Sequence, residues 1–129
     1  MPSLRCLVVD DSAQFLASAR TLLEREGIAV VGVASTIVDA LRCTEELQPD
    51  VVLVDINLGD ESGFELARRL DERKRTQAPP AERPEIILVS THADDFGELI
   101  AASRARGYLD KSDLSAHAIH GLVSGDGHA

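Results

Sequence analysis

The segment Val51–Val54 constrains the fold more than any other part of the chain, because all four of its residues are apolar and three are valine. A short run of this kind, without polar alternation, predicts a strand that is buried on both faces. Asp55 follows directly, and a turn-rich segment then leads to the helical spacing of Phe64, Ala67 and Leu70. A carboxylate at the carboxyl end of a buried parallel strand lies where open α/β sheets place their ligands.

The rest of the chain repeats this strand-then-helix order. Apolar runs predict four further strands, at residues 4–9, 28–34, 85–89 and 108–110. Helical spacing predicts five helices, which carry Phe15 and Leu23, Ile37 and Val38, Phe64 and Leu70, Phe96 and Leu99, and Leu114 and Ile119. Strict alternation favours right-handed crossovers, so we expect an α/β fold: a doubly wound, five-stranded parallel sheet with five helices on its two faces.

Capping residues set the expected ends of the first two helices. Asp11 or Ser12 can cap the first helix, and Gly27 can end it in the left-handed conformation. Ser35 is the expected cap of the second helix, which stops at Pro49.

Prolines limit the expected helices in the second half of the chain. The third helix is expected to run from about residue 62 to 71, because the polar segment 72–84 contains three prolines and reads as a long surface loop. The last helix is expected to begin near Ser112 or Asp113. Residues 1–124 then form one domain, and residues 125–129 form a polar tail.

Composition limits the class of partner. Thirteen basic residues face 22 acidic ones, for a net charge of -9, which argues against binding to nucleic acid or to an anionic membrane surface. No apolar run approaches the ~18 residues of a membrane span, and the amino terminus shows no signal peptide. Cys6 and Cys43 lie among apolar residues, as small core residues do in a reducing compartment. We therefore expect a cytoplasmic domain.

Polar residues follow four of the five predicted strands. Asp10 and Asp11 follow the first, Asp55 the third, Ser90 the fourth and Lys111 the fifth. Because the carboxyl ends of parallel strands share one edge of a sheet, we expect these side chains to converge. Three converging carboxylates require a counterion. Lys111 is one candidate, and Mg²⁺, which prefers oxygen ligands, is the other.

This set of groups predicts phosphoryl transfer. Asp55 would be the nucleophile that forms an aspartyl phosphate. Mg²⁺ held by Asp10 and Asp11 would neutralise the phosphoryl charge, while Lys111 and Ser90 would bind the other oxygens. Each residue has a plainer alternative as a helix cap, a turn residue or a surface lysine, but these alternatives together require four independent coincidences at one edge of the sheet.

The same residues form an ordered set of motifs: Val9-Asp10-Asp11, then Val54-Asp55 with Asn57 and Gly63 downstream, then Val89-Ser90, then Gly107-Tyr108-Leu109-Asp110-Lys111. From Leu4 to about Val123 the chain resembles the receiver domain of bacterial two-component response regulators. The resemblance implies a flavodoxin-like fold with strand order 2-1-3-4-5.

The resemblance also implies a role for each site residue. Asp55 would take a phosphoryl group from the phosphohistidine of a sensor histidine kinase or a phosphotransfer protein. Asp11, Asp55 and the main-chain carbonyl of Asn57 would ligate Mg²⁺, with Asp10 acting through water. Ser90 would turn toward the phosphoryl group and Tyr108 would move inward with it, although a half-buried tyrosine that only packs is an equal alternative. The face of the fourth helix, fifth strand and fifth helix would then be read by a downstream protein or a second copy.

Four residues depart from the pattern of that family. Ser90 stands where threonine is commoner, and Thr91 where a small residue is frequent. Gly59 replaces a frequent proline, which predicts a more mobile loop. Ser112 follows Lys111 where proline is usual, and a cis bond there would cost ~2.5–4 kcal/mol, so we expect a trans bond and a shifted Lys111.

Three classes of function remain open. The leading one is a signalling switch without an output domain of its own, not an enzyme beyond its own phosphotransfer and slow autodephosphorylation. An aspartyl-phosphate phosphatase is disfavoured, because Asn57 stands where such an enzyme would use a second carboxylate as general acid. A phosphorylation-independent interaction module is disfavoured by the intact Asp10, Asp11, Asp55 and Lys111.

Overall fold

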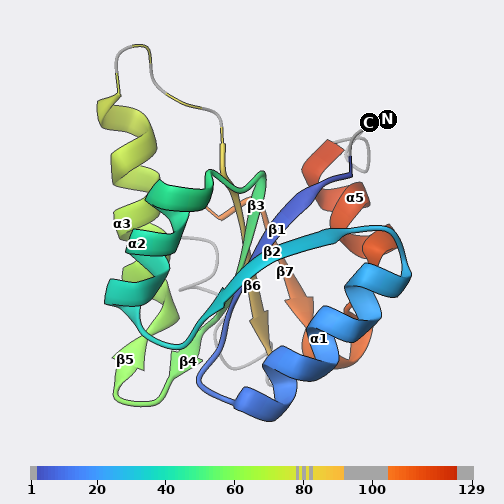
Figure 1. Cartoon of the computed structure of the whole chain (residues 1–129). Coiled ribbons are helices and arrows are strands. Elements are labelled where there is room, and N and C mark those ends of the chain that lie inside the picture. The colour runs from blue at the N-terminus through green and yellow to red at the C-terminus, as the bar shows by residue number, and fades with distance from the viewer. Residues whose placement is uncertain (1–2, 78, 80, 82, 92–104, 125–129) are drawn as a thin grey trace.

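The computed structural model describes residues 3–77, 79, 81, 83–91 and 105–124. Its main sheet consists of five parallel strands: β1 (Arg5–Val9), β2 (Ala29–Ala34), β3 (Val51–Asp55), β6 (Glu85–Ser90) and β7 (Gly107–Asp110). They lie in the order β2-β1-β3-β6-β7, which corresponds to the expected order 2-1-3-4-5 (Figure 1). The predicted doubly wound parallel sheet is therefore confirmed.

Helices cover both faces of this sheet (Figure 1). α2 (Ile37–Leu47) and α3 (Gly63–Thr76) pack on one face, and α1 (Ala13–Arg25) and α5 (Ala116–Ser124) pack on the other. In β1, for example, Leu7 and Val9 join the α2–α3 core, whereas Cys6 and Val8 join the α1–α5 core. The strands are continuously apolar because both of their faces are covered.

The ends of the first two helices follow local capping chemistry. The hydroxyl of Ser12 accepts a hydrogen bond from the backbone N–H of Phe15, and Gly27 has a φ of +98° just beyond the end of α1, as predicted. The cap of α2 is Thr36 and not Ser35. Thr36 directly precedes the helix in an extended conformation, and its hydroxyl accepts from the N–H of Asp39 at 3.1 Å.

The predicted end of the third helix at residue 71 is wrong, because α3 continues to Thr76. The first proline after the start of this helix is Pro79, which lies beyond the helix end and so does not break it. Ion pairs of Arg68 with Glu72 (2.8 Å) and of Arg75 with Asp71 (3.5 Å) support the added turn.

Other helix predictions also need correction. α5 begins later than expected, because residues Lys111–Asp113 form a separate 3₁₀ helix. Val38, one of the apolar residues of α2, is 70% exposed and does not join the core. The predicted fourth helix, with Phe96 and Leu99, lies outside the described residues.

Two further features bear on the surroundings of the protein. Both cysteines are free, with Cys6 buried and Cys43 half-buried, as expected for core residues. Within the described part of the chain, no helix combines the length and the apolar character that crossing a membrane would require.

Candidate functional site

The first two strands of the site end side by side. β1 and β3 are neighbours, with Val9 opposite Val54, so Asp10 and Asp55 leave the sheet together. Asp10 is fully buried and Asp55 is 6% exposed, whereas Asp11 is exposed. One carboxylate oxygen from each of the three residues lies within 4.8 Å of the other two. The structure thus brings together the three carboxylates that the sequence placed at this edge.

Lys111 reaches the same point from the end of β7. Its Nζ lies 2.7 Å from Oδ2 of Asp10 and 3.2 Å from Oδ2 of Asp55. Burial lowers the pKa of Lys111, but the hydrogen bond to Asp10 and the charges of Asp55 and Asp10 outweigh it, so that the net pKa is raised. Lys111 therefore carries a full positive charge between two buried carboxylates.

The surroundings of the Asp55 carboxyl group disfavour its charged form. Burial raises its pKa to about 6, and the neighbouring Asp10 adds to this rise. The N–H of Asn57, which donates to Oδ1 of Asp55 at 3.0 Å, opposes the rise, as does the charge of Lys111. One ammonium group shared by two buried carboxylates leaves the site short of positive charge.

The donor set fits a hard cation. Oδ1 of Asp10 accepts from the N–H of Ser12 at 2.8 Å. Oδ2 of Asp10 is buried, and its partner is the ammonium of Lys111 at 2.7 Å. Three carboxylate oxygens in this spacing suit Mg²⁺, whose preferred ligands are hard oxygens. Asp10, Asp11 and Asp55 are the side chains that would hold it.

Ser90 and Tyr108 belong to the next two strands of the sheet, β6 and β7. Ser90 ends β6, opposite Asp110 of β7, and is 6% exposed. Tyr108 is half-buried against the α2–α3 core, and its hydroxyl donates to the carbonyl of Ser90 at 3.2 Å. The two predicted switch residues are therefore in contact, while their movement stays a prediction.

The segment after Asp55 is a small hairpin and not the mobile loop that Gly59 predicted. β4 (Asn57–Leu58) pairs with β5 (Glu61–Ser62), and Gly59 occupies the turn with a φ of +68°. The dipeptide Gly59-Asp60 was the available signal for such a two-residue hairpin. A Cβ on Gly59 would lie 3.3 Å from Oδ2 of Asp11, so the turn packs directly against the carboxylate cluster.

Glu61 is a residue of this hairpin that sequence reasoning missed. Its Oε1 accepts a hydrogen bond from the N–H of Ile37 at 2.9 Å, across 24 positions of sequence. The hairpin that follows the phosphoacceptor candidate is thereby tied to the first turn of α2.

The backbone conformation at Lys111 is fixed by a side-chain hydrogen bond and not by a proline. The Lys111–Ser112 bond is trans, as predicted, since Arg83–Pro84 is the single cis bond among the described residues. Oδ1 of Asp110 accepts from both the N–H (3.0 Å) and the hydroxyl (2.8 Å) of Ser112. This side-chain cap starts the 3₁₀ helix that carries Lys111.

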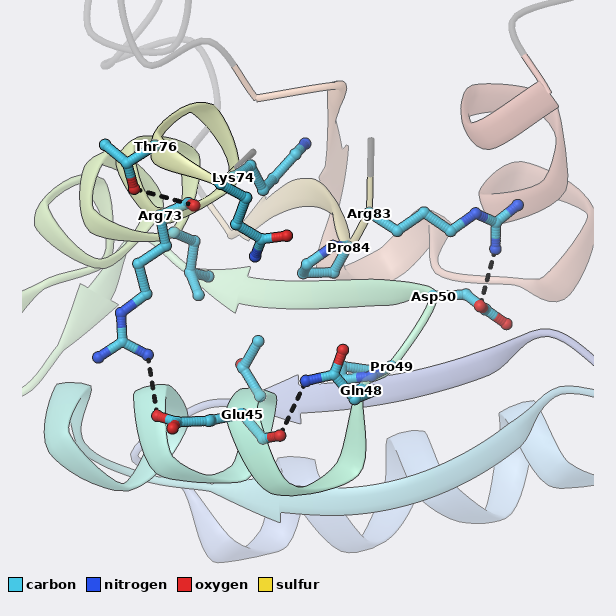
Figure 2. A pocket seen from close by; sticks show the side chains of 12 residues that line it. Glu45, Gln48, Pro49, Asp50, Arg73, Lys74, Thr76, Arg83 and Pro84 are labelled. Atoms are coloured by element: carbon cyan, nitrogen blue, oxygen red, sulfur yellow. Dashed lines mark hydrogen bonds and ion pairs between the residues drawn. The ribbon is translucent and has the colours of Figure 1, made fainter. Parts of the chain in front are cut away.

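A hollow lies at the opposite edge of the sheet (Figure 2). It has a volume of about 420 Å³ and lies among the carboxyl-terminal ends of α2 and α3 and the residues that enter β6. Its charged groups engage one another, as in the pairs Arg73–Glu45 (3.8 Å) and Arg83–Asp50 (2.9 Å). Basic side chains there also complement the negative ends of the helices. The charges of the hollow are thus compensated within the fold, and we take the carboxylate cluster as the functional site.

Comparison with known proteins gives the class to which this sheet and carboxylate cluster belong. The family model of the response regulator receiver domain matches residues 6–120. The chain therefore belongs to the response regulator receiver domain family of two-component signalling.

Individual relatives agree with this assignment. The chain is 39% identical over 94 residues to sensory transduction protein LytT of Bacillus cereus, covering 72% of this chain and 35% of the relative. It is 35% identical over 96 residues to a protein-glutamate methylesterase/protein-glutamine glutaminase of Hahella chejuensis, covering 74% of this chain and 25% of that protein. The chain thus spans only a quarter to a third of the length of these two relatives.

Solved structures show the same fold. The signal receiver domain of a modulated diguanylate cyclase from Desulfovibrio desulfuricans G20 superimposes with a TM-score of 0.76 at 29% identity, over 98% of this chain and 95% of that one.

Proposed function

We propose that this chain is a phosphorylation-dependent switch in which Asp55 accepts a phosphoryl group from the phosphohistidine of a sensor histidine kinase or a phosphotransfer protein. One observation carries the proposal: the ammonium of Lys111 lies 2.7 Å and 3.2 Å from two adjacent buried carboxylates, those of Asp10 and Asp55. Two buried acids that share one cation destabilise the folded protein, and clusters of this kind are typical of functional sites.

The chemistry follows from the groups present. A carboxylate oxygen of Asp55 bonds to phosphorus as the phosphorus–nitrogen bond of the donor breaks, and the electron pair of that bond stays on the donor imidazole. Bound Mg²⁺ would supply charge neutralisation for the phosphoryl oxygens. Asp10, Asp11, Asp55 and the main-chain carbonyl of Asn57 would hold that ion, while Lys111 and the hydroxyl of Ser90 would bind the remaining oxygens.

The output of the switch passes through the face that includes β7 and α5. The hydroxyl of Tyr108 donates a hydrogen bond to the carbonyl of Ser90 (3.2 Å), so a movement of Ser90 would change the position of the tyrosine. A downstream protein or a second copy of the chain, in the cytoplasm, reads the altered face.

Intact-mass measurement tests the acceptor. Wild type and Asp55→Asn are incubated with acetyl phosphate, with and without Mg²⁺. We expect an adduct of about 80 Da on wild type only, and only with Mg²⁺. Asp60→Asn is the matched control, because Asp60 is an exposed acid in the neighbouring turn.

An adduct on Asp55→Asn would show that another residue is the acceptor. No adduct on a wild-type protein that binds Mg²⁺, tested also with a phosphohistidine donor, would favour the phosphorylation-independent interaction module.

A further inference from the structure

Phe15 lies on the first turn of α1. Its ring packs against the α1–α5 core and is half-buried. The Nζ of Lys111 lies 4.3 Å from the centroid of this ring. An ammonium group at this distance over an aromatic face is attracted by the ring quadrupole. Phe15 is therefore a third partner of the Lys111 ammonium, besides Asp10 and Asp55.

The three partners differ in how they respond when the site is used. The attraction of Asp10 for Lys111 weakens once a cation shares that carboxylate, and the attraction of Asp55 weakens once its charge is consumed in an acyl phosphate. The ring of Phe15 is uncharged and takes part in neither event. Its attraction for the ammonium is unchanged by the occupancy of the site.

Lys111 needs such a partner, because its side chain is a flexible chain of four methylene groups and its ammonium is readily hydrated. Only 19% of that side chain is exposed, so the ring also occupies a side of the ammonium that water would otherwise reach. We propose that Phe15 is a positioning residue for Lys111, which keeps the ammonium in the pocket for the phosphoryl oxygens. The kinetic part of this inference rests on the phosphoryl transfer proposed above.

Lysine-selective NMR tests the contact without any phosphoryl transfer. The chain contains two lysines, Lys111 and Lys74, and Lys74 lies on α3 far from the site, so it serves as an internal reference. In ¹³C-lysine protein free of Mg²⁺, the ε-methylene resonance of Lys111 should be shifted upfield by the ring current of Phe15. Phe15→Leu should abolish this shift, and Phe15→Tyr should keep it.

The kinetic test uses acetyl phosphate and saturating Mg²⁺. Phe15→Leu should slow phosphoryl uptake about three- to tenfold, the range expected for a partly desolvated cation–π contact, while Phe15→Tyr should restore the rate. Phe64→Leu is the matched control, because Phe64 is a half-buried phenylalanine of the α2–α3 core and should leave the rate unchanged.

The outcomes separate the two proposals. An unshifted Lys111 resonance in wild type, or equal rates for Phe15→Leu and Phe64→Leu, would overturn the role of Phe15. If wild type acquires no phosphoryl group from any donor, the proposed function fails, while the ring-current comparison still decides whether Phe15 holds Lys111.

Discussion

Gly63 is the residue at which the backbone of the site leaves no room for a side chain. Its N–H donates to the carbonyl of Ile56 at 2.9 Å, and a Cβ would collide with the carbonyl oxygen of Asp55 and lie 2.7 Å from Cα of Ile56. Gly63→Ala should therefore displace the backbone that carries Asp55. We expect a loss of about 2 kcal/mol or more in the free energy of unfolding, measured by urea denaturation.

Gly121→Ala is the control for this substitution. Gly121 lies within α5, and a Cβ there would meet nothing within 4 Å, so alanine should be neutral or stabilise the helix by up to about 1 kcal/mol. A Gly63→Ala protein as stable as Gly121→Ala would contradict the close approach at Asp55.

At the scale of elements, the hairpin β4–β5 joins the carboxylate cluster to α2. Glu61 satisfies the N–H of Ile37 at the positive end of the helix, where an anion is favourable. Glu61→Ala should destabilise the protein by about 1 kcal/mol and lower the protection of the Ile37 amide from hydrogen exchange. Glu61→Gln retains a hydrogen-bond acceptor and should lose less stability and less amide protection.

The comparison variant for the hairpin is Glu46→Ala, because Glu46 is an exposed acid within α2 itself. Equal stability and equal amide protection in Glu61→Ala and Glu46→Ala would mean that the hairpin does not support the helix.

The elements also show why sequence reasoning succeeded in part. The strands were predictable because a parallel strand covered on both faces is a continuous apolar run. The convergence of Asp10, Asp55 and Lys111 was predictable because topology alone puts strand ends at one edge. The roles of Phe15 and Glu61 were not, since each depends on one side-chain contact with a residue that is distant in sequence and has no periodic signature.

For the whole molecule, the buried charges of the carboxylate cluster affect the free energy of unfolding. The chain has a net charge of -9, and the pKa of Asp55 is raised from 3.8 to about 6 by burial. A carboxyl group with a raised pKa contributes stability that is fully present below pH 3.8 and is lost as the pH rises through about 6. At neutral pH without a divalent cation, the folded protein therefore carries an unfavourable buried charge.

Asp55→Asn removes this charge and should make the protein more stable than wild type in EDTA at neutral pH, by on the order of 2 kcal/mol. The gain should shrink as the pH falls from 6 toward 4, because wild type then protonates Asp55 in the folded state. Adding Mg²⁺ should raise the Tm of wild type by mass action and that of Asp55→Asn much less, since a ligand of the ion is missing. Thermal unfolding of both proteins, beside Asp60→Asn, measures each effect. An Asp55→Asn protein that is less stable than wild type in EDTA would mean that the Lys111 ion pair, and not desolvation, dominates at Asp55.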